Sequence, residues 1–310
     1  MHKIDILMAT YNSEKYISEQ LQSIINQTYK DFHLYICDDV STDSTSNILS
    51  EYKLQYNNIV SILKNETNKG AKYNFSSLFQ NSQADYVMFS DHDDVWLNNK
   101  IEVTYNKIIE LENTYSKDTP ILVFTDKFVT DDKLNIIAKS HNKSEKFNTN
   151  DFSLNRLLIG NVASGCTIMV NAALRKICGT INSNALMHDY WLMLTAAAFG
   201  HIGYINIPTM YYRQHNNNQL GAQNNSILNA LKNIKTGKQN LKNIVLKNIT
   251  QAEAFYNQYE NILSDSNKYI LKEFIKLRDK RNISFIKSMV HNKFYKSGIL
   301  KNLGLIYAFI

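Results

Sequence analysis

The sequence predicts an α/β fold in which a mixed, mainly parallel β-sheet is flanked by helices and followed by a helical C-terminal extension. Short apolar runs alternate with helical patterns through the first ~90 residues, which is typical of a parallel sheet covered on both faces. Polar residues follow each apolar run directly, as they do at strand ends. From about residue 222 onward the pattern is almost entirely helical and amphipathic.

The expected elements follow one another in a regular order. In the first part of the chain, strands are expected at residues 3–9, 32–37, 58–63 and 85–89, and helices at 17–25, 41–56 and 71–79. Beyond residue 97 the pattern is looser, with helices expected at 98–112 and 188–199, strands at 121–125 and 166–170, and a polar loop at 130–150. We therefore expect one domain over residues 1–220 and a helical extension over residues 221–310.

The composition is that of a globular protein with a sizeable core, since 44% of the 310 residues are hydrophobic. Cys37, Cys166 and Cys178 match neither a disulfide framework nor a metal motif, so we expect reduced thiols and a cytoplasmic location. We expect no signal peptide, because a strand pattern begins at Lys3. We also expect no membrane-spanning segment, because no apolar run approaches ~20 residues.

The net charge of +6 is unevenly distributed along the chain. Residues 221–310 carry 15 basic and 5 acidic side chains, whereas residues 1–220 carry 19 basic and 23 acidic ones. The basic extension is suited to an anionic surface, either a membrane or a nucleic acid. A helical tail that is simply rich in lysine explains the same balance equally well.

A cluster of carboxylates follows the fourth expected strand. Asp91, Asp93 and Asp94 occupy three of four consecutive positions. Such carboxylates repel one another and resist desolvation unless a cation lies among them, and Mg²⁺ or Mn²⁺ is the natural oxygen-ligating ion. The alternative is a solvated turn in which the aspartates cap a helix.

Ligands of open parallel sheets bind beyond the carboxyl ends of the strands. Three polar clusters lie at such ends: Thr10-Tyr11-Asn12, Asp38-Asp39, and Asp91 to Asp94. A tyrosine ring can stack on a base, a carboxylate can accept a hydrogen bond from a pyrimidine imide or a ribose hydroxyl, and a metal can bridge two phosphates. Together they indicate a nucleoside diphosphate pocket. The sequence has neither a Walker-type loop nor the dinucleotide glycine pattern, which disfavours ATP hydrolysis and NAD chemistry.

Taken together, these motifs resemble those of a known family. They are Ala9 to Asn12, Asp38 to Asp43, Asn68 to Gly70 and Asp91 to Asp94. Over residues 3–220 the chain resembles the inverting family 2 glycosyltransferases of GT-A fold. The Asp-x-Asp-Asp-x-Trp form is similar to the bacterial rhamnosyltransferase-like subgroup, which builds cell-wall, capsular or O-antigen polysaccharides. Three further segments are also similar to that subgroup: Asn161 to Thr167, His188 to Trp191 and Tyr212 to His215.

The resemblance implies a role for each matching position. The nucleotide sugar is expected to contact Ala9, Thr10, Tyr11, Asp38, Asp39, Lys69, Asp91 and Arg213. The cofactor, Mn²⁺ or Mg²⁺, is expected to bind Asp93 and His215, and the acceptor to contact Asn161, Gly165, His188 and Trp191. Two positions depart from the family pattern: Val40 replaces the usual glycine after the paired aspartates, and Tyr190 stands where the subgroup usually has a second tryptophan.

Asp189 is the expected general base. An inverting transfer needs one carboxylate to deprotonate the acceptor hydroxyl as it attacks the anomeric carbon. Because the leaving group is a metal-bound nucleoside diphosphate, no second carboxylic acid is required. Other interpretations stay open: Asp189 as a helix cap, His215 as a solvent-exposed side chain, and Trp191 as a core residue.

Residues 282–310 combine apolar side chains with interleaved lysines, namely Lys287, Lys293, Lys296 and Lys301. A basic amphipathic helix of this kind can lie in a membrane interface, so we expect peripheral attachment to the inner face of the cell membrane. The alternatives are packing on the catalytic domain or on a second copy of the chain.

The leading hypothesis is a metal-dependent inverting hexosyltransferase that extends a surface polysaccharide or lipid-linked glycan, with dTDP-L-rhamnose as the first candidate donor. A UDP-hexose or UDP-N-acetylhexosamine donor remains an alternative, because the motifs that bind uridine and thymidine are alike. An inactive nucleotide-sugar-binding scaffold would require the loss of Asp93 or Asp189, and both are present. The acidic body and the lack of a recognisable motif weigh against a nucleic-acid partner.

Overall fold

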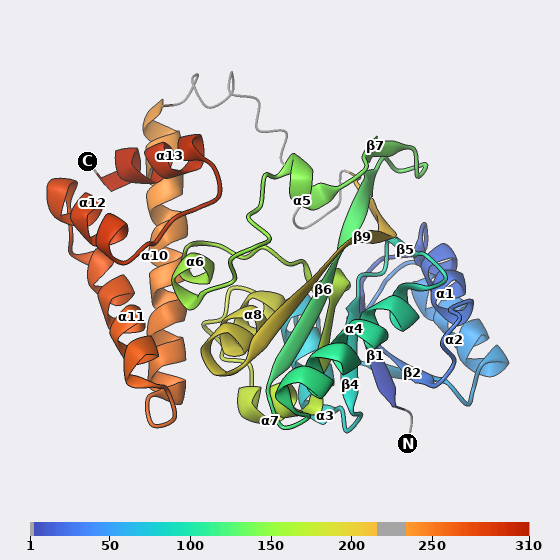
Figure 1. Ribbon diagram of the computed structural model, residues 1–310. Coiled ribbons are helices and arrows are strands. Elements are labelled where there is room, and N and C mark those ends of the chain that lie inside the picture. Colours follow the sequence, from blue (N-terminus) through green and yellow to red (C-terminus); the bar gives the residue numbers. More distant parts are fainter. Residues whose placement is uncertain (1–2, 216–233, 310) are drawn as a thin grey trace.

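The strands of the molecule form a single sheet, shown with the flanking helices in Figure 1. The computed structural model describes residues 3–215 and 234–309. The strands are β1 (Ile4–Thr10), β2 (Phe32–Asp38), β3 (Val60–Lys64), β4 (Tyr86–Ser90), β5 (Val95–Trp96), β6 (Ile121–Thr130), β7 (Ile136–Ala138), β8 (Ile168–Asn171) and β9 (His201–Arg213).

The helices in the first two thirds of the chain flank this sheet. They are α1 (Ile17–Ile25), α2 (Thr45–Gln55), α3 (Ala71–Asn81), α4 (Lys100–Tyr115), α5 (His141–Ser144), α6 (Leu154–Ile159), α7 (Ala172–Cys178) and α8 (His188–Phe199), with a 3₁₀ turn at Gly165–Thr167. The C-terminal helices are α10 (Ile234–Tyr259), α11 (Asp265–Ile275), α12 (Asn282–His291) and α13 (Ile299–Phe309), with a 3₁₀ turn at Lys276–Arg278.

The sheet is parallel in its N-terminal half and mixed beyond it. The strand order is β3-β2-β1-β4-β8-β6-β9-β5, and β7 pairs with β6 outside this path. The first four strands of the order run parallel, whereas β8 lies antiparallel between β4 and β6, and β6 pairs in parallel with β9. This arrangement confirms the predicted mixed α/β fold.

The residues of β1 show how the two faces of the sheet are covered. Side chains alternate along a strand, so Ile6 and Met8 point to one face and Leu7 to the other. The first face packs against α1, α2 and α4, and the second against α3, α7 and α8. Because both faces are covered, all seven residues of β1 are buried.

Two stretches differ from the sequence-based expectation. Helix α2 begins at Thr45 rather than at Ser41, because the backbone N–H and hydroxyl of Ser41 both donate to Asp38 and hold this segment in a loop. The expected polar loop at 130–150 contains β7 and α5. Asp126 anchors it by accepting hydrogen bonds from Ser140 Oγ and from the backbone N–H of Asn142.

The C-terminal helices pack on the sheet domain and share its core. Figure 1 shows them at one end of the molecule beside α6 and α8, whereas α1 and α2 lie at the other end. Phe255 of α10 packs edge-on against Trp191 of α8, with ring centroids 5.2 Å apart. The predicted boundary between residues 220 and 221 lies outside the described residues. Among the helices that the structure describes, none is long and apolar enough to cross a bilayer.

Candidate active site

The carboxyl ends of the parallel strands bring the predicted polar clusters side by side. Thr10, the last residue of β1, pairs in register with Asp38, the last residue of β2. On the other side of β1, Met8 pairs with Ser90, the last residue of β4. The three polar loops that follow these strands therefore begin at one edge of the sheet, where ligands of such sheets bind.

Hydroxyl groups hold Asp38 in place at this edge. Its Oδ1 accepts hydrogen bonds from Thr10 Oγ1 at 3.0 Å and from Ser41 Oγ at 2.5 Å. Asp38 is only 1% exposed, so its main effect is to shape the surrounding loop. The loop after β1 presents Tyr11, which is 48% exposed and offers an open ring face. Ala9 is buried, and its carbonyl oxygen lies 3.3 Å from His92 Nδ1.

Asp39 organises the loop that leads into α3. Its carboxylate accepts hydrogen bonds from Asn65 Nδ2 at 2.7 Å and from the backbone N–H groups of Lys69 at 2.9 Å and Gly70 at 2.7 Å. Burial alone would raise the pKa of Asp39, but these hydrogen bonds outweigh it and lower the pKa. Asp39 therefore stays ionised. The Lys69 side chain is exposed and lies over the ring of Tyr73.

The acidic cluster after β4 is enclosed and strongly repulsive. Burial raises the pKa of Asp94 well above its usual range, and the charges of Asp93 and Asp91 raise it further. Asp94 Oδ1 accepts the backbone N–H of Arg213 at 3.1 Å. Its Oδ2 is buried and accepts no hydrogen bond from any residue in the described part of the chain. Asp94 can therefore ionise here only at a high cost unless a cation lies beside it.

Asp93 and His215 meet although 122 positions separate them in the sequence. His215 Nε2 lies 2.9 Å from Asp93 Oδ2, and both side chains are slightly exposed. The imidazole ring stacks on Tyr16, with centroids 4.9 Å apart. Carboxylate oxygens and an imidazole nitrogen beside other closely spaced carboxyl groups fit a divalent cation such as Mn²⁺ or Mg²⁺.

A second set of potential ligand atoms lies deeper. Asp91, Asp94 and Cys166 each place one such atom within 4.8 Å of the others. Burial and the nearby Asp91 charge raise the pKa of the Cys166 thiol well above its usual range, so the thiol remains protonated and donates to Asp91. A sulfur atom is a poor ligand for Mg²⁺ or Mn²⁺, so this set is better explained as a buried hydrogen bond.

Arg213 binds other parts of the protein in this structure, and its expected contact with a phosphate stays a prediction. Its guanidinium donates to the backbone oxygens of Asp93 at 2.8 Å and Asp132 at 2.5 Å, and to Glu19 Oε2 at 2.5 Å. Only 3% of Arg213 is exposed. Arg213 therefore links the loop that carries Asp93 to neighbouring elements. A guanidinium can do this because its several N–H groups can donate to several acceptors at once.

Asp189, at the start of α8, has the properties of a base near neutrality. Its Oδ2 accepts the backbone N–H of Gly165 at 2.9 Å, and its Oδ1 accepts that of Tyr190 at 2.6 Å. Burial raises the pKa of Asp189 to about 6 despite these two hydrogen bonds. The charge of Asp91 contributes to the same rise, which places Asp189 close to the acidic cluster.

Gly165 and His188 pack against each other beside Asp189. A Cβ atom on Gly165 would lie 2.6 Å from His188 Nε2, so only glycine fits under the Asp189 carboxylate. His188 is 2% exposed and lies between the rings of Phe75 and Phe89. Burial lowers the pKa of His188 to about 3, so the ring stays neutral. Contrary to the expected acceptor contact, His188 therefore belongs to the core beneath the site.

Trp191 is also a core residue, and its predicted stacking on an acceptor sugar is wrong for this structure. It is fully buried, and its indole N–H donates to Tyr259 Oη at 3.2 Å. Asn161 bonds to the backbone of Ala163 and lines a separate cavity beside the C-terminal helices.

Lys127 is a central residue of the site that the sequence analysis missed. It is 3% exposed, donates from Nζ to Ser164 Oγ at 2.8 Å, and lies over the ring of Tyr212. Its charge lowers the pKa values of Asp91, Asp94 and Asp189, so one buried ammonium faces both the acidic cluster and the candidate base. The available signal was a lysine within the otherwise apolar strand β6.

Comparisons with known proteins identify the family of the chain. Residues 5–178 match the family model described as glycosyl transferase family 2. The chain is 34% identical over 230 residues to the dTDP-rhamnosyl transferase RfbG of Shigella flexneri, covering 69% of this chain and 74% of that protein. It is 31% identical over 107 residues to an Escherichia coli UDP-Glc:alpha-D-GlcNAc-diphosphoundecaprenol beta-1,3-glucosyltransferase, covering 34% of this chain and 41% of that protein.

Solved structures agree on the fold. Residues 1–349 of S. aureus TarS, crystallised with UDP, superpose with a TM-score of 0.58 at 17% identity, covering 89% of this chain and 71% of that one. A mannosyltransferase from Pyrobaculum calidifontis, in complex with GDP-Man and Mn²⁺, superposes with a TM-score of 0.52 at 12% identity. The match covers 99% of this chain and 86% of that one. With the family model matching more than half of its residues, the chain belongs to glycosyl transferase family 2 and is a glycosyltransferase.

Proposed function

We propose that this glycosyltransferase moves a sugar from a nucleoside-diphosphate donor to a growing surface polysaccharide with inversion at the anomeric carbon. The observation that carries the proposal is the placement of Lys127, whose charge acts on both the Asp91–Asp94 cluster and Asp189. A donor diphosphate and an attacking hydroxyl would then meet in one enclosed site.

For the donor, dTDP-L-rhamnose is the first candidate. The long match to a dTDP-rhamnosyl transferase supports it. UDP-hexoses and UDP-N-acetylhexosamines are the second candidates, supported by relatives whose names or titles carry UDP-Glc and UDP-GlcNAc. We assign the nucleotide to the edge formed by Thr10, Tyr11, Asp38, Asp39 and Lys69, with the base against the Tyr11 ring.

We assign the divalent cation to Asp93 and His215, with Asp91 nearby. Their oxygen and nitrogen donors support this assignment, as does the buried Asp94 Oδ2, which accepts no hydrogen bond from any residue that the structure describes. When bound, Mn²⁺ or Mg²⁺ would neutralise the charge that develops on the leaving diphosphate. The chain's own part is to hold these ligands in place, which Arg213 does by binding the backbone of Asp93.

Asp189 is assigned as the general base. The acceptor oxygen would form a bond to the anomeric carbon while the bond from that carbon to the diphosphate breaks, and the hydroxyl proton would pass to the carboxylate of Asp189. A pKa of about 6 suits this task, because the group is mostly ionised at neutral pH yet still basic enough to accept a proton.

We assign residues 282–310 to a membrane surface. Apolar side chains that the structure leaves exposed on α12 and α13 are Ile283, Val290, Ile299, Leu300, Leu303 and Tyr307. Lysines lie among them in the sequence, and anionic lipids attract such segments. The enzyme would then work at the inner face of the cell membrane on a glycan or lipid-linked glycan, and contact with a second copy of the chain is the competing explanation.

The test is donor binding by calorimetry, first with Mn²⁺ or Mg²⁺ and then with EDTA. The panel is dTDP-rhamnose, UDP-galactose, UDP-glucose, UDP-N-acetylglucosamine and GDP-mannose. We expect metal-dependent binding of dTDP-rhamnose that Asp93→Ala abolishes and that Asp118→Ala, at an exposed loop position, leaves intact. Metal-dependent binding of a UDP-sugar alone would select the second candidates. Folded protein that binds no donor would favour an inactive scaffold.

A further inference from the structure

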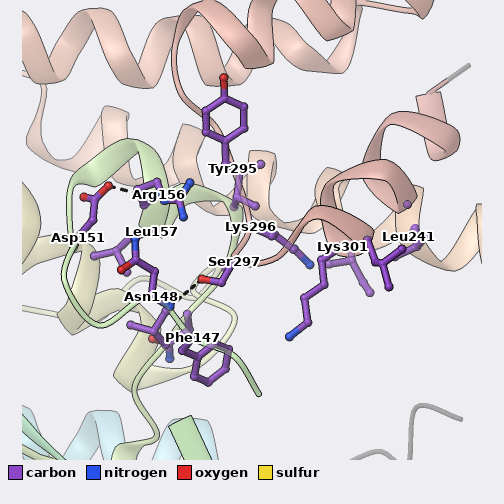
Figure 2. A pocket seen from close by; sticks show the side chains of 17 residues that line it. Phe147, Asn148, Asp151, Arg156, Leu157, Leu241, Tyr295, Lys296, Ser297 and Lys301 are labelled. Atoms are coloured by element: carbon purple, nitrogen blue, oxygen red, sulfur yellow. Dashed lines mark hydrogen bonds and ion pairs between the residues drawn. The ribbon is translucent and has the colours of Figure 1, made fainter. Parts of the chain in front are cut away.

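A cavity of about 400 Å³ lies between the sheet domain and the C-terminal helices (Figure 2). One wall is formed by residues 147–162, and the other by α10, the segment 295–297 and α13. None of the residues assigned to the nucleotide or the metal lines it. Its apolar lining includes Leu157, Ile159, Val162, Leu241, Ile244 and Leu300.

The cavity also holds more positive than negative charge. Arg156 pairs with Asp151 at 3.8 Å, and Lys301 pairs with Glu145 at 3.3 Å. Lys296 has no acceptor for its ammonium group among the residues that the structure describes, although burial and the charge of Lys301 both lower its pKa. An ammonium that is partly desolvated and unpaired in this way favours an anionic ligand.

Ser297 adds a polar group beside this cation. Its Oγ accepts the backbone N–H of Asn148 at 2.8 Å, and a hydroxyl that accepts one hydrogen bond still has its own hydrogen to donate. Figure 2 shows the side chains of Lys296, Ser297 and Lys301 around the same part of the cavity. Two ammonium groups and a hydroxyl are the donor set that a phosphate requires.

The apolar side of the cavity reaches the surface that we assign to the membrane. Leu300 lines the cavity and is 74% exposed, and the adjacent Ile299 is 79% exposed. A hydrocarbon chain bound along α13 would therefore pass from the membrane interface into the cavity without crossing water. A free polyol phosphate would leave this apolar wall uncovered, so the lining favours a phosphate that carries a hydrocarbon chain.

The inner wall of the cavity leads directly to the candidate base. Asn161 and Val162 line the cavity, and Gly165, three residues beyond Val162, donates its backbone N–H to Asp189. Four residues of extended chain span at most ~14 Å, which limits the distance between the backbones of Asn161 and Gly165. A sugar joined to a phosphate in the cavity could thus extend to Asp189.

We infer that this cavity binds the phosphate ester of a lipid-linked sugar acceptor, with Lys296 as the main anion contact and the wall around Leu300 and Ile244 holding the start of the lipid chain. The inference rests on the proposed function, because it names the acceptor class of that site. It assigns the C-terminal helices a direct part in acceptor binding.

The test is calorimetric binding of farnesyl diphosphate in EDTA, where the donor site lacks its metal. Inorganic diphosphate and farnesol are the matched half-ligands. We expect farnesyl diphosphate to bind at least about tenfold more tightly than either, because it alone satisfies both the cation and the apolar wall. Lys296→Met should weaken it by at least about tenfold, and Lys296→Arg should retain it.

Lys287→Met is the matched charge control, since Lys287 is an exposed lysine of α12 that does not line the cavity. It should leave farnesyl diphosphate binding unchanged. Equal binding to wild type and Lys296→Met would overturn the site, and equal binding of inorganic diphosphate would overturn the lipid component. Donor binding with Mn²⁺ is measured on the same samples, so a protein that binds its donor but no farnesyl diphosphate refutes this inference and leaves the proposed function standing.

Discussion

Asp39 on the donor side and Asp189 on the acceptor side are enclosed carboxylates whose pKa values move in opposite directions. Asp39 accepts hydrogen bonds from one side-chain amide and two backbone N–H groups, which outweigh burial and lower its pKa. Among the described residues, Asp189 accepts two backbone N–H groups, one from the adjacent residue, and burial raises its pKa to about 6. The balance between burial and hydrogen-bond donors decides whether such a carboxylate is a fixed anion or a base.

This difference separates carboxylates that hold the structure together from the carboxylate that we assign to proton transfer. On the donor side, Asp38 and Asp39 accept hydrogen bonds from residues at the edge of the sheet and in the adjoining loops. On the acceptor side, Asp189 keeps the capacity to take up a proton. We therefore expect substitutions at Asp39 to act on stability and substitutions at Asp189 to act on catalysis.

The largest expected effect is on transfer by Asp189→Asn. The amide keeps the shape of the side chain but cannot accept the proton, so we expect kcat to fall by about a hundredfold to ten-thousandfold. Donor affinity and the free energy of unfolding should change little. Single-turnover transfer and donor calorimetry on the same variant check this, and turnover near that of the wild type would remove Asp189 from the role of base.

Asp39→Ala should have the opposite profile. The substitution leaves the partly buried N–H groups of Lys69 and Gly70 without this acceptor, so we expect a loss of about 2 kcal/mol in the free energy of unfolding. Denaturant unfolding of Asp39→Ala beside Asp189→Asn measures the contrast. If Asp39→Ala is as stable as the wild type, the view of Asp39 as a structural anion fails.

The pH dependence of transfer should follow Asp189. Because the base must be ionised, kcat should rise about tenfold per pH unit below a pKa of about 6 and level off above it. The same raised pKa makes the protonated form favourable in the folded state. Its contribution to stability is therefore complete below the usual value of 3.8 and is lost as the pH rises through about 6.

Activity and this part of the stability should thus move in opposite directions between those two pH values. Asp189→Asn provides the control, because its unfolding free energy should lack the corresponding loss. A rate profile that is flat across this range would show that another group, or a step other than proton transfer, limits turnover.

The fold was predictable because its signals are local. Apolar runs followed by polar turns marked β1, β2 and β4, and parallel pairing then requires their carboxyl ends to share one edge. The start of α2 was misplaced although its cause is local, because Ser41 donates to Asp38, three residues before it, instead of entering the helix. The structure within residues 130–150 was not predictable, because it depends on hydrogen bonds to Asp126 from Ser140 and Asn142.

A residue of the site was predictable where its motif alone indicates its role. It was not predictable where its role depends on whether the fold buries it. His188 and Trp191 follow the motif, yet α3 and α10 cover them from distant parts of the sequence. Arg213 is enclosed by partners from helix α1 and from two loops, which no periodicity reveals. Lys127 was missed for the complementary reason, since a lysine in a buried strand has meaning only once its charged neighbours are known.

The smallest expected effect is that of Val40→Gly, on the donor side, on the free energy of unfolding. Its φ of +64° lies in the left-handed region, which costs a residue with a Cβ atom roughly 1–2 kcal/mol and is most unfavourable for a β-branched side chain. Val40→Gly removes this strain but adds backbone entropy to the unfolded chain, worth about 0.5–1 kcal/mol in the other direction. We expect a net gain of up to about 1 kcal/mol in the free energy of unfolding.

Asn12→Gly is the matched control for Val40→Gly. Asn12 also has a positive φ, of +47°, but asparagine tolerates this region and its Oδ1 accepts the backbone N–H of Thr42 at 2.8 Å. Glycine there relieves little strain and loses a hydrogen bond, so stability should fall by about 1 kcal/mol. If instead Val40→Gly destabilises the protein, the Val40 side chain must make contacts worth more than its strain, and the donor edge is held by packing as well as by the hydrogen bonds of Asp38 and Asp39.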